Sequence, residues 1–136
     1  MRLSDSSRNF QKKIYEALTG DAALMAAVSN KVFDYVLEDS TFPWIQIGDD
    51  TFKDWNTMDF YGKEATITIH TWSRKQGRME CKTIQGHIQR VLNGAYLPLE
   101  SAVLVLLQQE FETSMIDPDG VTLHGIQRFR ALIQEA

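Results

Sequence analysis

The segment AVLVLLQQEFETSMIDPDGVTLHGIQRFRALIQ, residues 102–134, has the pattern of a long β-hairpin. Its first part, residues 102–112, is predominantly apolar, and its last part, residues 121–134, alternates between two sets of side chains as a strand does. Between them lies Asp117-Pro118-Asp119-Gly120, where proline presets φ and glycine accepts the left-handed position of a turn. At about 3.3 Å per residue, strands of this length outreach a small sheet. We therefore expect the end of this hairpin, near residues 113–122, to project beyond the core.

Helical periodicity precedes the hairpin in three places. A first helix is expected to start near Ser6 or Ser7, both suitable N-caps, and to end at Gly20. A short helical turn capped by Asp21 follows it. The main helix is predicted over residues 78–92, where apolar residues recur at helical spacing.

Two further strands are predicted over residues 44–52 and 63–72, with a loop rich in aromatic residues between them. Residues 31–35 are expected to be extended or to form a short strand. The second predicted strand alternates Ala or Ile with Thr, which fits an antiparallel sheet covered on one face. Together these elements predict a single α+β domain over residues 1–136, in the order αββαββ, with an antiparallel sheet packed on the main helix.

Composition places the chain among ordinary globular proteins. It has 136 residues, of which 43% are hydrophobic and 24% charged, and a formal net charge of −4. An acidic balance argues against a dedicated duplex-DNA-binding protein, which needs a basic surface. The amino-terminal residues lack the apolar segment of a signal peptide. The longest apolar run, residues 102–107, is far too short to span a membrane. We therefore expect a product that stays in the cytoplasm unless it leaves inside a particle.

The sequence contains no recognisable catalytic, cofactor-binding or metal-binding motif. The single cysteine, Cys81, is expected to be a small buried helix residue. Histidines occur at positions 70, 87 and 124, without the spacing of metal ligands. His70 and His124 could meet across a sheet, but nothing in the sequence requires it. The acidic pairs Asp49-Asp50 and Asp117 with Asp119 are read as turn residues.

The sequence also offers candidates for a contact surface. Large apolar side chains in a loop often mark such a surface, although they could equally fold back over the sheet. A small basic cluster, Arg74, Lys75 and Arg78, precedes the main helix and is expected to be solvated. The candidate subunit or partner contacts are Trp55, Phe60, Tyr61, Met115, Asp117, Asp119 and His124.

Four groups of residues resemble one known family over nearly the whole chain. They are Tyr15-Glu16-Ala17-Leu18 with Asp21-Ala22-Ala23-Leu24; Lys31-Val32-Phe33-Asp34 with Phe42-Pro43-Trp44-Ile45-Gln46-Ile47-Gly48; Thr68-Ile69-His70-Thr71-Trp72-Ser73-Arg74 with Gly77 and Lys82; and Asp117-Pro118-Asp119-Gly120 with His124-Gly125-Ile126-Gln127-Arg128-Phe129-Arg130-Ala131. Their order is similar to that of the tail-completion, or tail-terminator, proteins of siphophages, prophages and gene-transfer agents. These motifs are patterns of hydrophobic and turn residues, so they carry no catalytic residues over to this chain.

The resemblance implies a structural virion protein rather than an enzyme. It implies a ring, commonly a hexamer, that caps the head-proximal end of the tail tube and joins it to the head-completion complex. The implied partners are further copies of the chain, the major tail-tube protein and a head-completion or adaptor protein. DNA would pass through the lumen without specific binding, no membrane would be involved, and the protein would reside in the virion tail after assembly in the host cytoplasm.

Two other interpretations compete with this one. The first is another head-tail adaptor or a minor tail component. The second, from a different class, is a small α+β ligand-binding protein or enzyme with a pocket near His70 and His124.

Overall fold

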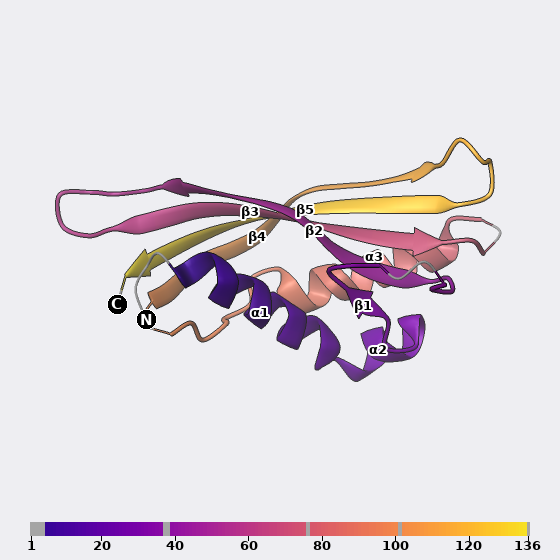
Figure 1. Ribbon diagram of the computed structural model, residues 1–136, viewed down its shortest axis with the longest axis horizontal. Coiled ribbons are helices and arrows are strands. Elements are labelled where there is room, and N and C mark those ends of the chain that lie inside the picture. Colours follow the sequence, from indigo (N-terminus) through magenta and orange to yellow (C-terminus); the bar gives the residue numbers. More distant parts are fainter. Residues whose placement is uncertain (1–4, 37–38, 76, 101, 136) are drawn as a thin grey trace.

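A computed structural model describes residues 5–36, 39–75, 77–100 and 102–135. Five strands form one sheet in the order β1-β2-β3-β5-β4, with the helices on one face (Figure 1). The α+β class predicted from the sequence is confirmed. The helices are α1 (Ser6–Thr19), α2 (Ala22–Val28) and α3 (Met79–Leu92), and the strands are β1 (Val32–Phe33), β2 (Trp44–Asp54), β3 (Gly62–Ser73), β4 (Ala102–Ile116) and β5 (Leu123–Glu135).

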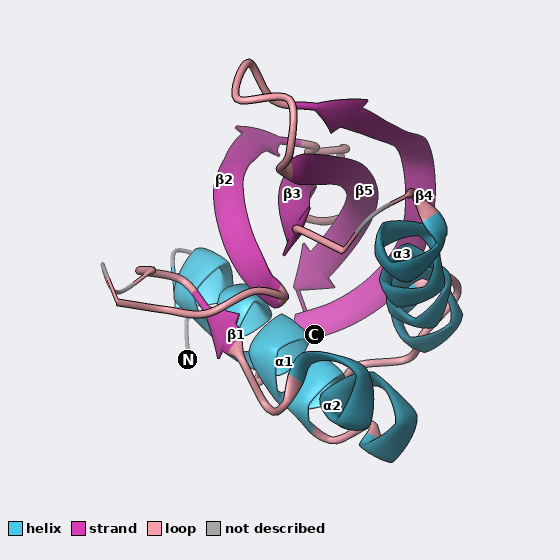
Figure 2. Cartoon of the chain, turned by 90° about the vertical axis from the view of Figure 1, so that its right-hand side faces the viewer, coloured by secondary structure: helices cyan, strands magenta, loops and turns pink. Residues whose placement is uncertain are grey.

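The two N-terminal helices follow the predicted pattern with one correction. α1 begins at Ser6, so Asp5 rather than either serine occupies the N-cap, and its side chain makes no capping hydrogen bond. α2 is capped as expected, because Asp21 Oδ2 accepts a hydrogen bond from the Leu24 amide at 2.9 Å. The two helices meet at an angle that places both against the same side of the sheet (Figure 2).

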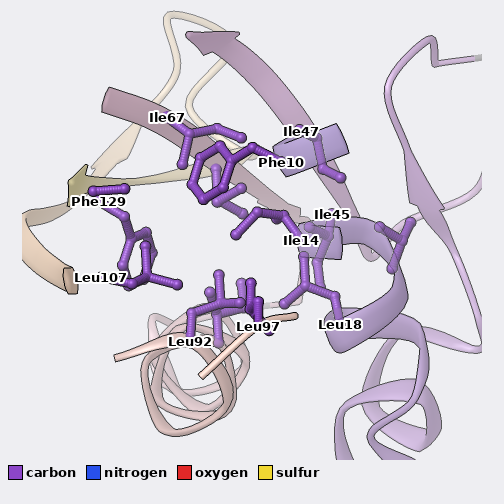
Figure 3. Close-up of a cluster of buried hydrophobic side chains, with 14 of the residues drawn as sticks. Phe10, Ile14, Leu18, Ile45, Ile47, Ile67, Leu92, Leu97, Leu107 and Phe129 are labelled. Atoms are coloured by element: carbon purple, nitrogen blue, oxygen red, sulfur yellow. The ribbon is translucent and has the colours of Figure 1, made fainter. Parts of the chain in front are cut away.

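The core lies between the helices and the sheet. α1 contributes Phe10, Ile14 and Leu18 at helical spacing, and all three are fully buried. They meet the inward side chains of the sheet and of α3, as Figure 3 shows. Burying one such side chain contributes about 1.5–3 kcal/mol, so this cluster is the main source of stability.

α3 differs from the prediction at one position. Its apolar stripe, including Cys81, is buried or partly buried, and so is Gln85, a polar residue that is only 1% exposed. The Gln85 side-chain amide donates to the Thr113 carbonyl at 2.9 Å, and Gln127 Nε2 donates to the Gln85 carbonyl at 3.0 Å. The polarity of Gln85 indicates solvent, but a buried polar residue whose hydrogen bonds are satisfied can lie on the core side of a helix.

The aromatic loop between the two central strands is shorter than predicted. β2 and β3 pair as an antiparallel hairpin as far as Asp54 and Lys63, leaving only residues 55–61 as a loop. This hairpin extends along the long axis of the molecule past the start of α1, opposite to the β4–β5 turn (Figure 1). The expected extended segment at residues 31–35 contains β1, which pairs in parallel with Ile45 and Gln46 of β2.

The C-terminal hairpin is present, and β4 is longer than predicted. β4 reaches Ile116 and stays paired with β5 from Ala102↔Glu135 to Ile116↔Leu123. Its turn is tied to the rest of the domain, because Arg74 Nε donates to Thr122 Oγ1 at 2.9 Å. The sheet therefore has one long free edge, formed by β4, and a second edge along β2 that β1 covers only at its beginning.

Candidate functional site

The described part of the chain contains no cluster of side chains suited to bind a metal ion. Across residues 5–36, 39–75, 77–100 and 102–135, no three His, Cys, Asp or Glu side chains are placed to share a metal ion. Within the same ranges, no helix has both the length and the apolar character needed to cross a membrane.

The two central histidines do meet across the sheet. His70 Nδ1 lies 2.7 Å from His124 Nε2, and the His124 ring stacks on Trp72 with centroids 3.8 Å apart. Burial lowers the pKa of both imidazoles, and His70 lowers the pKa of His124 further, while Asp49 and Asp117 act in the opposite direction. The His70 ring also covers Gly48, where an added Cβ would lie 2.6 Å from the ring. The pair is a packed feature of the sheet face that lies away from the helices.

An aromatic row continues from this pair toward the end of the sheet. Trp72 lies opposite Trp44 on β2, with ring centroids 6.4 Å apart, and Trp44 stacks on Phe42 at 4.3 Å. The Arg74 guanidinium lies over the Phe42 ring, 4.5 Å from its centroid. Both tryptophans are half-buried.

Beside this row the surface forms a hollow of about 500 Å³, here called the end hollow. Its walls come from the segment before β2, the end of β3 and the β4–β5 turn. The residues that define it are Asp34, Trp44, Trp72, Arg74, Asp117 and Asp119. Sequence reasoning did not find this site, because its walls are far apart along the chain and only the sheet register brings them together.

The predicted turn role of Asp119 is confirmed. Its side chain accepts hydrogen bonds from the amides of Val121 and Thr122, both at 2.8 Å, and from Thr122 Oγ1 at 2.6 Å. These bonds, led by that from the Thr122 side chain, lower the pKa of Asp119 to about 2. Asp117 belongs to the same turn. Its backbone amide donates a hydrogen bond to the Thr122 carbonyl.

The predicted contact residues fall into two groups at opposite ends of the molecule. Trp55 and Phe60 pack edge to face in the 55–61 loop, with centroids 5.3 Å apart, and both are half-buried, whereas Tyr61 is 62% exposed. At the other end, Met115 faces His124 across the β4–β5 pair and is 43% exposed. The loop aromatics thus serve in part as a local lid and in part as exposed surface.

The free edge of β4 is a surface that the sequence analysis did not single out. Its exposed large apolar side chains are Val103, Val105, Phe111, Met115 and Ile116. The sequence did carry a signal for this surface. From Ala102 to Leu107 every residue is apolar, so both faces of the strand are apolar. One face of that run enters the core, so the other face is left for solvent or for a partner.

Comparison with known proteins identifies the family. The family described as "Tail completion protein gp17" matches residues 12–134 of this chain. The chain belongs to the tail completion protein gp17 family. Over 128 residues it is 30% identical to the tail completion protein gp17 of Bacillus phage SPP1, and the match covers 94% of each protein.

The fold also has a solved counterpart in a virion. A chain from the virion of a native gene transfer agent particle superposes with a TM-score of 0.88, covering 94% of this chain and 96% of that one, at 22% identity. That similarity shows a shared fold. Family membership makes this protein a structural component of a phage tail and confirms the prediction that it is not an enzyme. The ligand-binding or enzymatic alternative near His70 and His124 is therefore set aside.

Proposed function

We propose that this tail completion protein forms a ring at the head-proximal end of the tail tube, stops growth of the tube and joins it to the head-completion complex. The observation that carries the proposal is the nearly full-length match to the SPP1 protein, whose name assigns it to completion of the tail. Its partners would be further copies of itself, in a hexamer, with the major tail-tube protein on one side and a head-completion or adaptor protein on the other.

The edges of the sheet support a ring of identical subunits. β4 contains no lysine, arginine or proline; its charged residues are Glu110 and Glu112, and its pairing with β5 has two register shifts. Adjacent strands from β2 to β4 are all antiparallel, so β2 and β4 run in opposite directions at the two sides of the sheet. A neighbour's β2 edge placed against β4 would continue the same antiparallel pattern. Such head-to-tail contacts close into a ring when the rotation between subunits allows it.

The charge of the chain supports passage of DNA through the ring. A formal charge of −4 gives little general attraction for phosphates, which suits a lumen that DNA must leave quickly. The candidate contacts lie at opposite ends of the molecule: Tyr61 is in the β2–β3 loop, and Met115 and Asp117 are near the β4–β5 turn. We propose them as contacts to subunits or to adjoining rings.

Deleting the gene from its phage or prophage tests the proposal. We expect negative-stain electron microscopy of induced particles to show overlong tails and separate DNA-filled heads, both corrected by the wild-type gene in trans. Normal, infectious particles would refute any essential tail role. Tails of normal length that fail to attach to heads would show a joining role without termination, as for another head-tail connector.

A further inference from the structure

The end hollow combines aromatic faces with carboxylates. Phe42, Trp44 and Trp72 line it, and the His124 ring stacks on Trp72. The hollow already holds one guanidinium, since Arg74 lies over Phe42 and its Nη2 is 3.5 Å from Asp119 Oδ2. A planar cation resting on an aromatic ring beside a carboxylate is a favourable arrangement for arginine in particular.

The charges of the hollow are not balanced. Three carboxylates, Asp34, Asp117 and Asp119, face one guanidinium, Arg74, so the walls carry an excess of two negative charges. Asp119 is occupied by the turn and by Arg74. The side chains of Asp34 and Asp117 have no hydrogen bond or ion pair with any residue in the ranges that the structure describes, so their carboxylates are free for a ligand.

We propose that the end hollow receives an arginine side chain of a neighbouring virion protein, stacked on Trp44 and Trp72 and neutralised by Asp34 and Asp117. This inference rests on the proposed function for the identity of the partner, but the recognition itself needs only the folded chain. The volume of about 500 Å³ accommodates one extended side chain together with part of its backbone. The excess negative charge favours a cation as the ligand, and the aromatic lining favours a flat guanidinium over an ammonium.

The test is an NMR titration of the purified chain with N-acetyl-arginine amide. The chain has three tryptophans, and two of them, Trp44 and Trp72, line the hollow while Trp55 lies at the opposite end. We expect saturable shifts of the Trp44 and Trp72 indole N–H signals and a constant Trp55 signal. N-acetyl-citrulline amide, which has the same shape without the charge, should bind at least about fivefold more weakly.

Substitution of the free carboxylates makes the test specific. Asp34→Asn with Asp117→Asn should weaken binding about fivefold, because each exposed charge contact contributes modestly. Asp59→Asn, on the exposed loop at the other end, is the matched control and should leave affinity unchanged. Equal binding of the citrulline compound, or no saturable shift up to its solubility limit, would overturn the proposal.

A second measurement decides where the arginine comes from. In particles complemented with the Asp34→Asn, Asp117→Asn variant, we expect reduced joining of tails. Sedimentation of the purified wild-type chain should show no self-association through this hollow. Self-association that the double variant abolishes would place the arginine on a second copy and overturn the assignment to another protein. If deletion of the gene gave normal particles, the proposed function would be refuted. A positive titration would still show that the hollow binds arginine.

Discussion

The carbonyl oxygen of Gln85, on α3, accepts a hydrogen bond from the side-chain amide of Gln127, on β5, at 3.0 Å, and both residues are at most 1% exposed. The same amide nitrogen of Gln127 also lies 2.8 Å from Gln109 Oε1 on β4. A polar cluster therefore joins the main helix to both strands of the C-terminal hairpin, where an apolar contact would be expected. Buried hydrogen bonds of this kind specify one position of the helix on the sheet, since a shifted helix would leave the polar groups unpaired.

Gln127→Ala should destabilise the fold by about 1–3 kcal/mol, because the buried Gln85 carbonyl and the partly buried Gln109 side chain lose this donor. The measurement is the urea unfolding midpoint of the purified chain. Gln108→Ala, at an exposed position on the same hairpin, is the control and should change stability by less than about 0.5 kcal/mol. Equal effects of the two variants would show that the buried cluster contributes nothing particular.

Gly125→Ala should also destabilise the fold, by about 1–3 kcal/mol, through overpacking. A Cβ at position 125 would lie 2.9 Å from Cys81 Sγ and would overlap the Gln85 side-chain amide. Gly86→Ala is a matched comparison, because a Cβ there meets nothing within 4 Å and the position is inside α3. We expect Gly86→Ala to stabilise the chain by about 0.5–1 kcal/mol, as alanine does in a helix. The measurement is the thermal unfolding midpoint of both variants. An unchanged midpoint for Gly125→Ala would contradict the close packing of Gly125 against Cys81 and Gln85.

The His70–His124 pair should make stability depend on pH in the mildly acidic range. In the folded chain the pKa of each imidazole is lowered from 6.5, so below about pH 6.5 the unfolded chain binds more protons than the folded one. The contribution of the two neutral imidazoles to the free energy of unfolding is fully present above that pH. It falls as the pH drops toward the pKa values of the folded chain. Urea midpoints at about pH 7.5 and about pH 5.5 should therefore differ, with the lower value at acidic pH.

Variants identify the histidines responsible for this dependence. His70→Asn combined with His124→Asn should reduce the difference between the two pH values, whereas His87→Gln should retain it. His87 lies on α3, away from the pair, and serves as the control. A pH dependence that survives loss of both sheet histidines would assign it to the carboxylates instead.

Val105→Lys should block assembly without unfolding the chain. Val105 is 50% exposed on the free edge of β4, so a lysine there costs less than about 0.5 kcal/mol in the isolated protein but disfavours pairing with another strand. We expect normal thermal unfolding together with failure to correct the overlong tails of a deletion mutant. Thr83→Lys, on the exposed side of α3, should correct them. Full complementation by Val105→Lys would exclude the β4 edge as a subunit contact.

Much of the fold could be predicted from local patterns. Gly20 and Asn93-Gly94 mark the ends of α1 and α3, the Thr and Ile alternation gives the faces of β3, and Asp117-Pro118-Asp119-Gly120 gives the last turn. Each of these signals depends on residues close together in sequence, where backbone preference and side-chain period act directly. The family resemblance used the same patterns, which is why it pointed to a tail role but to no individual contact.

The features with consequences for binding depend on register between distant strands. The positions of Trp72 and His124 opposite each other, and of Trp44 opposite Trp72, follow from how β2, β3 and β5 align. A shift of one residue would turn each side chain to the other face, and no local pattern reports which alignment has the lower free energy. Gln85 illustrates the same limit, since its polarity indicated solvent until the hairpin supplied partners for its amide and carbonyl. Local sequence thus determined the elements and the faces they bury, whereas the end hollow and the buried glutamine cluster arise only when packing of the whole core selects one register.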